Sequence, residues 1–404
     1  MLDQVRPHYA KEFRCIGTAC EDTCCHGLDV VIDKVAYEKY QAPRFQQVIE
    51  HFEVVKSPTD AQYARIKLTG SLTCPFLTPD RLCGVQQQHG EQYLSEICRS
   101  YPRITRRIDG LLETALCLSC PEAARLVLLN PQLTAEEAGD HSRYHQFLRV
   151  RPESSRANGS PHQFLWEIRS FTLLLLRDRT YALWQRLFLL GLFCKRLDEL
   201  IASRQMGLVP ELLKTYAEIA DKGSVRSLMD EMPTQTTLQL AVVMEVIRRQ
   251  LEMTDAGHVH FRECIQDFLQ GIGSDAAGLP IESLAPAYGN AYAHYYHPFT
   301  EQYPFLLENY LINQVFRTRF PFGVSPNGTP SDAQAEFLTM CAHYGVMKGL
   351  LIGMAGHYGE SLSTAHVVKL VSTFARAVEH CPGFLGLRGL GLDNTNAAAI
   401  LLKN

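Results

Sequence analysis

Nine cysteines lie between residues 15 and 120 and form the most chemically distinctive pattern in the chain. Their spacing includes Cys-x4-Cys-x3-Cys-Cys and a later Cys-x2-Cys pair, and clustered soft thiolates favour zinc or iron–sulfur centres. Because four thiolates complete either centre, nine allow two four-cysteine sites or one cluster plus a zinc ion. We therefore predict metal ligands at Cys15, Cys20, Cys24, Cys25, Cys74, Cys83, Cys98, Cys117 and Cys120.

Other uses of these thiols fit the pattern less well. An odd number of clustered cysteines in a chain with no predicted signal peptide does not favour a disulfide framework. Buried reduced thiols without metal, or mixed ligation that includes His26 or His89, are the alternatives for individual positions. The four later cysteines are expected to pack in apolar surroundings, namely Cys194, Cys264, Cys341 and Cys381.

Two cofactor motifs are missing from the sequence. The radical S-adenosylmethionine spacing Cys-x3-Cys-x2-Cys begins at Cys20 and Cys24, but residue 27 is glycine and no β/α-barrel pattern surrounds it. No Gly-x-Gly-x-x-Gly follows a predicted strand, so a Rossmann cofactor site is unsupported.

The composition indicates a globular chain without a strong charge bias. Among 404 residues, 39 Lys and Arg oppose 43 Asp and Glu, which gives a net charge of −4, and 46% of the residues are hydrophobic. This balance disfavours a broad nucleic-acid or anionic-lipid surface, and no apolar run reaches the roughly 18–20 residues of a membrane span. The first residues lack a basic stretch followed by an apolar one, so no signal peptide is predicted. We expect a cytoplasmic protein that contacts neither nucleic acid nor membrane.

The cysteines must be positioned by a small mixed region, predicted over residues 1–130. Its signals are a short strand near Leu28–Ile32, a helix capped by Asp33, and a hairpin of Ile104–Ile108 and Leu111–Leu116. Asp109-Gly110 between the hairpin strands is typical of a two-residue turn. A helix is expected to start at Pro121, with Ser119 or Cys120 as its cap.

The remainder of the chain is predicted to be helical. Residues 131–160 are polar and turn-rich and are interpreted as a linker, whereas apolar residues recur at helical spacing throughout residues 161–404. The fold class is therefore predicted to be mainly α, with a small, loop-rich, cysteine-containing N-terminal region and a large all-helical region. Beyond the helices of residues 164–197, the expected helices are Leu208–Asp221, Thr236–Met253, Phe261–Leu269, Pro304–Arg319, Ala333–Met354 and Ala365–Glu379.

Several segments of the chain resemble the flagellin lysine-N-methylases, which contain a cysteine domain described as zinc- or iron-chelating. The similar segments cover most of the chain: Cys15–Asp33 (CIGTACEDTCCHGLDVVID), Cys74–Leu77, Leu82–Cys83, Glu96–Arg103 (EICRSYPR), Glu113–Leu128, Phe164–Phe193 and Glu308–Phe322. The resemblance implies transfer of a methyl group from S-adenosylmethionine to lysine ε-amines of flagellin. It also implies a [4Fe–4S] cluster held by these cysteines, whereas the spacing alone leaves zinc as the alternative metal.

A methylase needs its acceptor lysine in the neutral form. At the ordinary pKa of about 10.4, only a fraction on the order of 10⁻³ of lysine is neutral at pH 7, so an apolar slot or a proton acceptor is required. We predict Glu308 as the acceptor and Tyr310 as a second catalytic residue, with ion pairing and core packing as the alternative roles. Aromatic side chains that could wall a lysine channel are Tyr288, Tyr292, Tyr295, Tyr296, Phe299, Tyr303, Phe305, Tyr310, Phe316, Phe320 and Phe322.

Arginines near the segment Phe164–Phe193 are candidates to bind the carboxylate of S-adenosylmethionine through two parallel hydrogen bonds. They are Arg169, Arg177 and Arg179, with Arg186 close by. Ion pairing with Asp178 or Glu167 is the alternative role for these side chains. Arg99 and Arg103 flank Cys98 and are candidates to offset the negative charge of a thiolate centre.

Two functions other than methylation fit the same sequence. One is a non-enzymatic metal-binding or redox-responsive adaptor whose helical part docks a partner. The other is a nucleic-acid-binding zinc protein, which the negative net charge disfavours.

Overall fold

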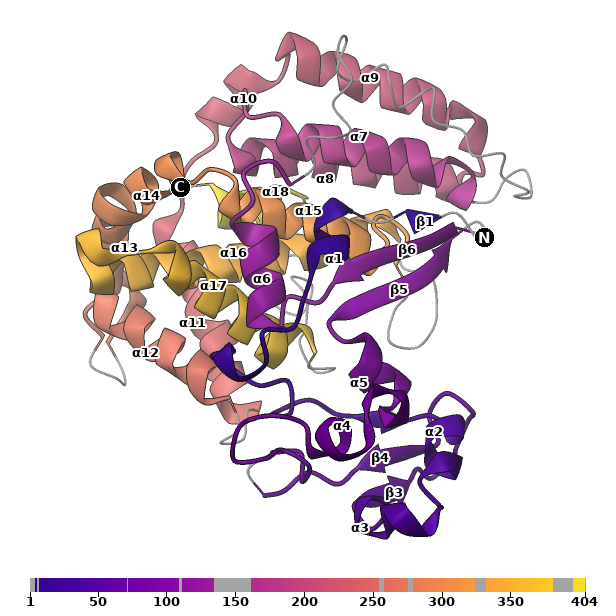
Figure 1. The fold of residues 1–404 in the computed structure, drawn as a ribbon. Coiled ribbons are helices and arrows are strands. Elements are labelled where there is room, and N and C mark those ends of the chain that lie inside the picture. Colours follow the sequence, from indigo (N-terminus) through magenta and orange to yellow (C-terminus); the bar gives the residue numbers. More distant parts are fainter. Residues whose placement is uncertain are drawn as a thin grey trace.

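The computed structural model describes residues 4–5, 7–70, 72–108, 111–133, 161–253, 258–274, 279–323, 332–380 and 395–403. Within these ranges, a large helical body lies beside a smaller cysteine-rich part (Figure 1). The predicted turn at Asp109-Gly110, most of the predicted 131–160 linker, and Cys381 lie outside the described residues.

The cysteine-rich part consists of short helices around a small antiparallel sheet, in which β4 lies between β2 and β3. Apolar residues from the sheet and the helices form its own core, including Ile32, Phe45 and Phe52. Asp33 caps α2 as predicted, since its carboxylate accepts the Ala36 N–H at 2.8 Å. The elements are β2 (Val31–Ile32), α2 (Lys34–Lys39), α3 (Gln46–Ile49), β3 (Phe52–Val54), β4 (Ala64–Ile66), α4 (Gly84–His89) and α5 (Glu96–Ser100).

A second group of early elements packs against the helical body instead (Figure 1). The predicted hairpin is present, with β5 and β6 antiparallel in the expected register, and β1 pairs in parallel with β6. Pro121 is the first residue of α6 and Cys120 is its cap, as predicted. The elements are β1 (Gln4–Val5), α1 (His8–Glu12), β5 (Arg103–Ile108), β6 (Leu111–Leu116) and α6 (Pro121–Leu128).

The helical body is organised around the long helix α16, which contacts α8, α11, α12, α13, α15, α17 and α18. The helices are α7 (Leu165–Arg177), α8 (Leu183–Ala202), α9 (Val209–Lys222), α10 (Arg226–Glu231), α11 (Thr236–Met253), α12 (Val259–Gly271), α13 (Ile281–Ala291), α14 (His297–Gln302), α15 (Leu306–Thr318), α16 (Ala333–Tyr358), α17 (Thr364–Phe374) and α18 (Thr395–Leu402). A π-helical turn, Ala375–Glu379, continues α17.

Helix α16 is a core helix. Glycines let it approach α12 closely, because a Cβ on Gly271 would lie only 1.8 Å from the carbonyl oxygen of Gly353. Ala333–Ser361 is the one segment of the described chain long and apolar enough to cross a membrane, and 94% of its apolar window is buried inside the protein. Its apolar surface is therefore covered by neighbouring helices.

The predicted fold class is confirmed: a small mixed N-terminal region with a hairpin is followed by a large helical region. The expected helix Thr236–Met253 coincides with α11, and the other expected helices differ by a few residues at their ends. The division at residues 130 and 160 stays a prediction.

Candidate active site

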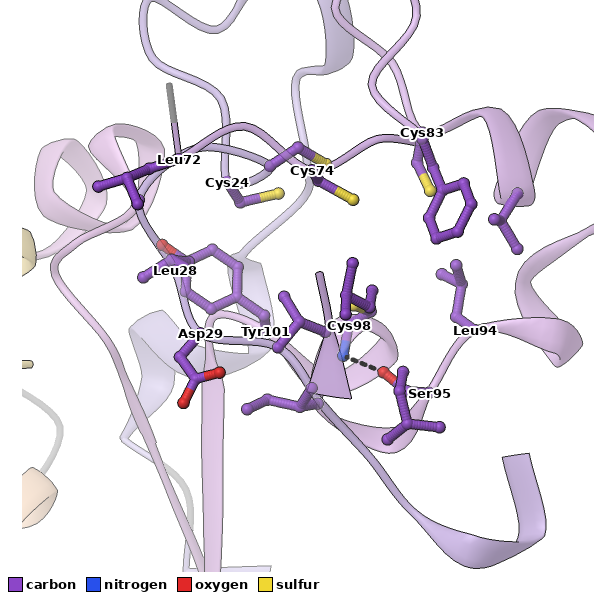
Figure 2. A pocket seen from close by; sticks show the side chains of 18 of the residues that line it. Cys24, Leu28, Asp29, Leu72, Cys74, Cys83, Leu94, Ser95, Cys98 and Tyr101 are labelled. Atoms are coloured by element: carbon purple, nitrogen blue, oxygen red, sulfur yellow. Dashed lines mark hydrogen bonds between the residues drawn. The ribbon is translucent and has the colours of Figure 1, made fainter. Parts of the chain in front are cut away.

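A cavity of about 530 Å³ lies where the cysteine-rich part meets the helical body. Figure 2 shows the sulfur atoms of Cys24, Cys74 and Cys83 along one side of it, with Leu28 at the end near Cys24 and Leu94 at the end near Cys83. Five of the nine predicted metal ligands line this cavity: Cys24, Cys25, Cys74, Cys83 and Cys98. Five cysteines that are far apart in the sequence therefore line one cavity.

Short loops bring the sulfurs together. The Cys74 N–H donates to the Cys25 carbonyl oxygen at 2.8 Å, which fixes the loop after β4 against the loop before β2. Cys83 stands at the cap of α4, where free backbone N–H groups favour negative charge on its sulfur. Cys98 lies in α5 and is exposed to the cavity. Each position is thus fixed by local backbone structure.

Four of these cysteines form a sulfur quartet, namely Cys24, Cys25, Cys74 and Cys83. The Cys25 thiol lies within hydrogen-bonding reach of the other three sulfurs, and this proximity raises the pKa of Cys25. The same proximity lowers the pKa of Cys24 to about 7 and that of Cys83 to about 6, and it lowers the pKa of Cys74 as well. Cys24, Cys74 and Cys83 therefore ionise more readily than ordinary thiols, as soft metal ligands must, whereas Cys25 holds its proton more tightly.

The donor types of the quartet fit a soft metal centre, because four thiolates are the ligand set of structural zinc and of [4Fe–4S] clusters. As the side chains stand, no three His, Cys, Asp or Glu residues in the described part of the chain form an arrangement that would hold an ion. All nine early cysteines are free thiols. Ligation by any one of them stays a prediction.

The other four predicted ligands lie outside the lining of the cavity. Cys117 is buried behind it, with its sulfur 3.1 Å from both Ser119 Oγ and His380 Nε2. Burial opposes ionisation of Cys117, but the bond to His380, the charges of His380 and Arg317 and the bond to Ser119 together outweigh it and lower the pKa of the thiol. Cys15, Cys20 and Cys120 likewise take no part in the quartet.

Arg376, in the π-helical turn, joins the cysteine loops to the helical body. Its guanidinium is 3.0 Å from the Asp22 carboxylate and donates to the carbonyl oxygens of Thr23, His26 and Ser119 at 3.0–3.2 Å. The side chain is 4% exposed, so these bonds form away from solvent. Arg376 therefore holds the loop that carries Cys24 and Cys25, and π-helical turns of this kind often occur at functional sites.

Arg376, His258 and His380 line the cavity, and the sequence analysis singled out none of them. Their contacts reach across the chain: Arg376 meets residues more than 250 positions earlier. The sequence did contain one indication that two of these residues lie together. Arg376 and His380 are four residues apart at the end of a predicted helix, so they share one face of it.

The predicted acceptor Glu308 is buried and paired with two arginines. Arg179 donates to both carboxylate oxygens at 2.9 and 3.0 Å, and Arg186 donates to one of them at 2.7 Å. The Tyr310 hydroxyl donates to Glu379 at 2.7 Å. Neither Glu308 nor Tyr310 lines the cysteine cavity, so their contacts match the alternative roles of ion pairing and core packing.

The predicted cofactor arginines also lie away from the cysteine cavity. Arg169 is buried and paired with Glu113, between the rings of Trp166 and Phe316. Arg179 is committed to Glu308, and Arg177 ends α7 outside the cavity lining. Their proposed role in binding S-adenosylmethionine stays a prediction.

The aromatic stretch forms part of the core of the helical body. All eleven residues are buried there or packed against it, and none lines the cysteine cavity. Cys194, Cys264 and Cys341 are fully buried in the same core, as expected of apolar packing.

Comparison with known proteins shows which family shares this architecture. The profile of the FliB lysine N-methylase C-terminal domain matches residues 169–398. This chain belongs to the FliB lysine N-methylase family. The match includes α12, α17 and the π-helical turn, and therefore the wall of the cavity formed by His258, Arg376 and His380.

Curated relatives of this FliB-family chain come from Salmonella. The lysine-N-methylases of Salmonella typhimurium and Salmonella choleraesuis are each 32% identical over 133 residues, which is 32% of this chain and 33% of the relative. The chain thus spans about a third of the length of these two relatives. The flagellar biosynthetic protein FliU of Salmonella muenchen is 32% identical over 133 residues, which cover 79% of that protein. No solved structure matches the chain.

Proposed function

We propose that this protein is a cytoplasmic, S-adenosylmethionine-dependent lysine N-methyltransferase that acts on flagellin at the cysteine cavity. The observation that carries this proposal is the family match over residues 169–398, which supplies one wall of that cavity. The relatives' names support both the lysine acceptor and the flagellar substrate. S-adenosylmethionine would supply the electrophilic methyl group.

We also propose that Cys24, Cys25, Cys74 and Cys83 hold a [4Fe–4S] cluster, with zinc as the alternative. Support comes from the proximity of Cys25 to the other three sulfurs and from the low pKa values of Cys24 and Cys83. A cluster would supply either a rigid cross-link between the loops or an electron. Arg376, which lowers the pKa of Cys24, would offset part of the negative charge of such a centre.

The walls of the cavity are suited to an acceptor lysine. Val30, Ile32, Phe52, Phe76 and Leu94 present apolar surface along which the lysine stem would lie. Removing the amine from water favours its neutral form. These residues would raise the neutral fraction above the roughly 10⁻³ that holds in water at pH 7.

The experiment that tests this function is transfer of a labelled methyl group from S-adenosylmethionine to purified flagellin by the full chain, prepared anaerobically. We expect label on flagellin lysines, and iron and sulfide in the purified protein with broad visible absorbance. The matched variants are Cys74→Ser in the quartet and Cys194→Ser in the helical core. Transfer should be lost in the first and kept in the second.

Other outcomes separate the alternatives. Colourless protein with stoichiometric zinc would replace the cluster with a zinc site. Protein that is fully loaded with metal yet transfers no methyl group to flagellin would contradict the enzyme and support the metal-binding adaptor.

A further inference from the structure

A second pocket, of about 290 Å³, lies at the C-terminal end of α15. Its lining residues are Arg106 of β5, Arg317 and Thr318 at the end of α15, Arg319, and Glu336 in the first turn of α16. None of them lines the cysteine cavity. We refer to this second pocket as the arginine pocket.

The arginine pocket contains more cationic than anionic groups. Three guanidinium groups line it against the single carboxylate of Glu336. Arg317 is committed to Glu379 at 3.1 Å and to Gln314 at 2.7 Å, which leaves two guanidinium groups facing one carboxylate. Of the other carboxylates nearby, Glu113 is paired with Arg169.

Among the described residues, neither Arg106 nor Arg319 forms an ion pair, although Glu336 lines the same pocket. Arg106 donates to the carbonyl oxygen of Arg317 at 2.5 Å, not to a carboxylate. Burial lowers the pKa of Arg106, and the cations of Arg317 and Arg319 lower it further, as expected where like charges crowd together. The buried Nε of Arg319 has no hydrogen-bond partner among the described residues.

The backbone also holds Arg319 in an unfavourable conformation. Its φ is +64°, in the left-handed region that costs a branched or long side chain about 1 kcal/mol or more. Glycine or asparagine would end α15 there without that cost. The sequence instead places a guanidinium at this position, next to two others.

We propose that the arginine pocket binds a carboxylate of a ligand. Guanidinium groups recognise carboxylates through paired, charge-assisted hydrogen bonds, and Arg106 and Arg319 form no ion pair among the described residues. The carboxylate would come either from the amino-acid part of S-adenosylmethionine or from an acidic side chain of the protein substrate. The choice between these two carboxylate sources rests on the proposed function. The proposal that the arginine pocket binds a carboxylate does not.

The position of the pocket links it to the cysteine cavity. Arg317 lines the arginine pocket and pairs with Glu379, and the next residue, His380, lines the cysteine cavity. The buried Arg317–Glu379 ion pair therefore connects a lining residue of the arginine pocket to the neighbour of a lining residue of the cysteine cavity.

The anion site is tested by direct binding of malonate, a small dicarboxylate, to the full chain by calorimetry. The variants are Arg106→Gln and Arg319→Gly, and the control is Arg196→Gln on the exposed face of α8. Each lost guanidinium should weaken malonate binding by about tenfold or more, because hydrogen bonds to charged groups contribute roughly that factor. The control should bind as the wild type does.

Arg319→Gly separates binding from folding. Glycine adopts a φ of +64° without strain, so this variant should unfold at or above the wild-type temperature while it loses malonate affinity. Saturable binding that is equal in wild type and both variants would overturn the proposal. So would an absence of saturable binding by the folded wild type.

A second arm identifies the source of the carboxylate. Binding of S-adenosylmethionine and binding of flagellin are each measured with wild type and Arg319→Gly. If Arg319→Gly binds S-adenosylmethionine more weakly than the wild type, the bound carboxylate is that of the amino-acid part of the cofactor. If the variant binds flagellin more weakly, the carboxylate is an acidic side chain of the substrate. Unchanged binding of both would overturn the assignment to a ligand carboxylate, even if methyl transfer itself is observed.

Discussion

Replacing Arg376 with glutamine should loosen the cysteine loops from the helical body. The substitution removes the ion pair with Asp22 and three hydrogen bonds to carbonyl oxygens, all centred on a side chain that is 4% exposed. Breaking one partner of a buried charge pair costs about 3–5 kcal/mol, and the separate bonds do not add beyond that because they share one group. We expect a loss of this size for the contact between loops and body.

Hydrogen exchange measures this local loss directly. The reporters are the amides of Gly27 and Cys74, which bond to the carbonyl oxygens of Leu72 and Cys25 at 2.9 and 2.8 Å. Because each 1.4 kcal/mol or so changes an equilibrium constant about tenfold, their exchange should become roughly 100- to 4,000-fold faster in Arg376→Gln. Arg376→Lys keeps the positive charge but loses the forked set of guanidinium donors. Its exchange rates at these two amides should therefore lie between those of the wild type and those of Arg376→Gln.

The control for this prediction is Arg196→Gln. Arg196 pairs with Glu199 on the surface of α8, with 58% of its side chain exposed, and such pairs contribute at most about 1 kcal/mol. The reasoning would be refuted if Arg376→Gln altered the exchange of Gly27 and Cys74 no more than Arg196→Gln does.

Three further predictions concern the helical body and are read out by urea unfolding. Glu308→Gln should lower the free energy of unfolding by about 3 kcal/mol, because it leaves the buried Arg186 without its carboxylate partner. A decrease below about 1 kcal/mol would show that the ion pair does not stabilise the fold. Gly353→Ala should cost about 1–3 kcal/mol, since the new Cβ would lie 2.2 Å from Phe268; Gly207→Ala, with nothing within 4 Å, is its control. Burial lowers the pKa of Lys348 from 10.5 to about 7, so the unfolded chain binds more protons than the folded one between these values, and stability should rise with pH across that window. Lys348→Met should flatten this rise and raise stability at pH 7, and an unchanged slope would contradict the assignment.

Local sequence patterns predicted most of the fold. The helix Thr236–Met253 and the hairpin strands Ile104–Ile108 and Leu111–Leu116 were found because their signals lie in neighbouring residues. Asp33 and Pro121 marked helix starts for the same reason, since capping depends on residues within one turn.

The candidate site was predicted only in part. Thiol chemistry marked the cysteines, but the sequence could not separate the quartet from Cys117, because that division depends on how distant loops pack. Arg376 was missed since its partners lie at least 250 residues away. Glu308 and the aromatic stretch were singled out by residue type, whereas their ion pairs and core packing depend on residues distant in the sequence; their catalytic roles stay predictions.

The most direct test of the central claim is to fill the cysteine cavity from its apolar wall. Leu28→Trp introduces bulk beside the quartet without removing a sulfur or Arg376, and Leu208→Trp places the same side chain at an exposed site that is 51% accessible. The measurement is labelled methyl transfer to flagellin, with metal content and unfolding midpoint recorded for each protein. We predict that Leu28→Trp loses methyl transfer while keeping its metal and its fold, and that Leu208→Trp keeps all three. Full methyl transfer by folded Leu28→Trp would contradict the assignment of the cavity as the active site.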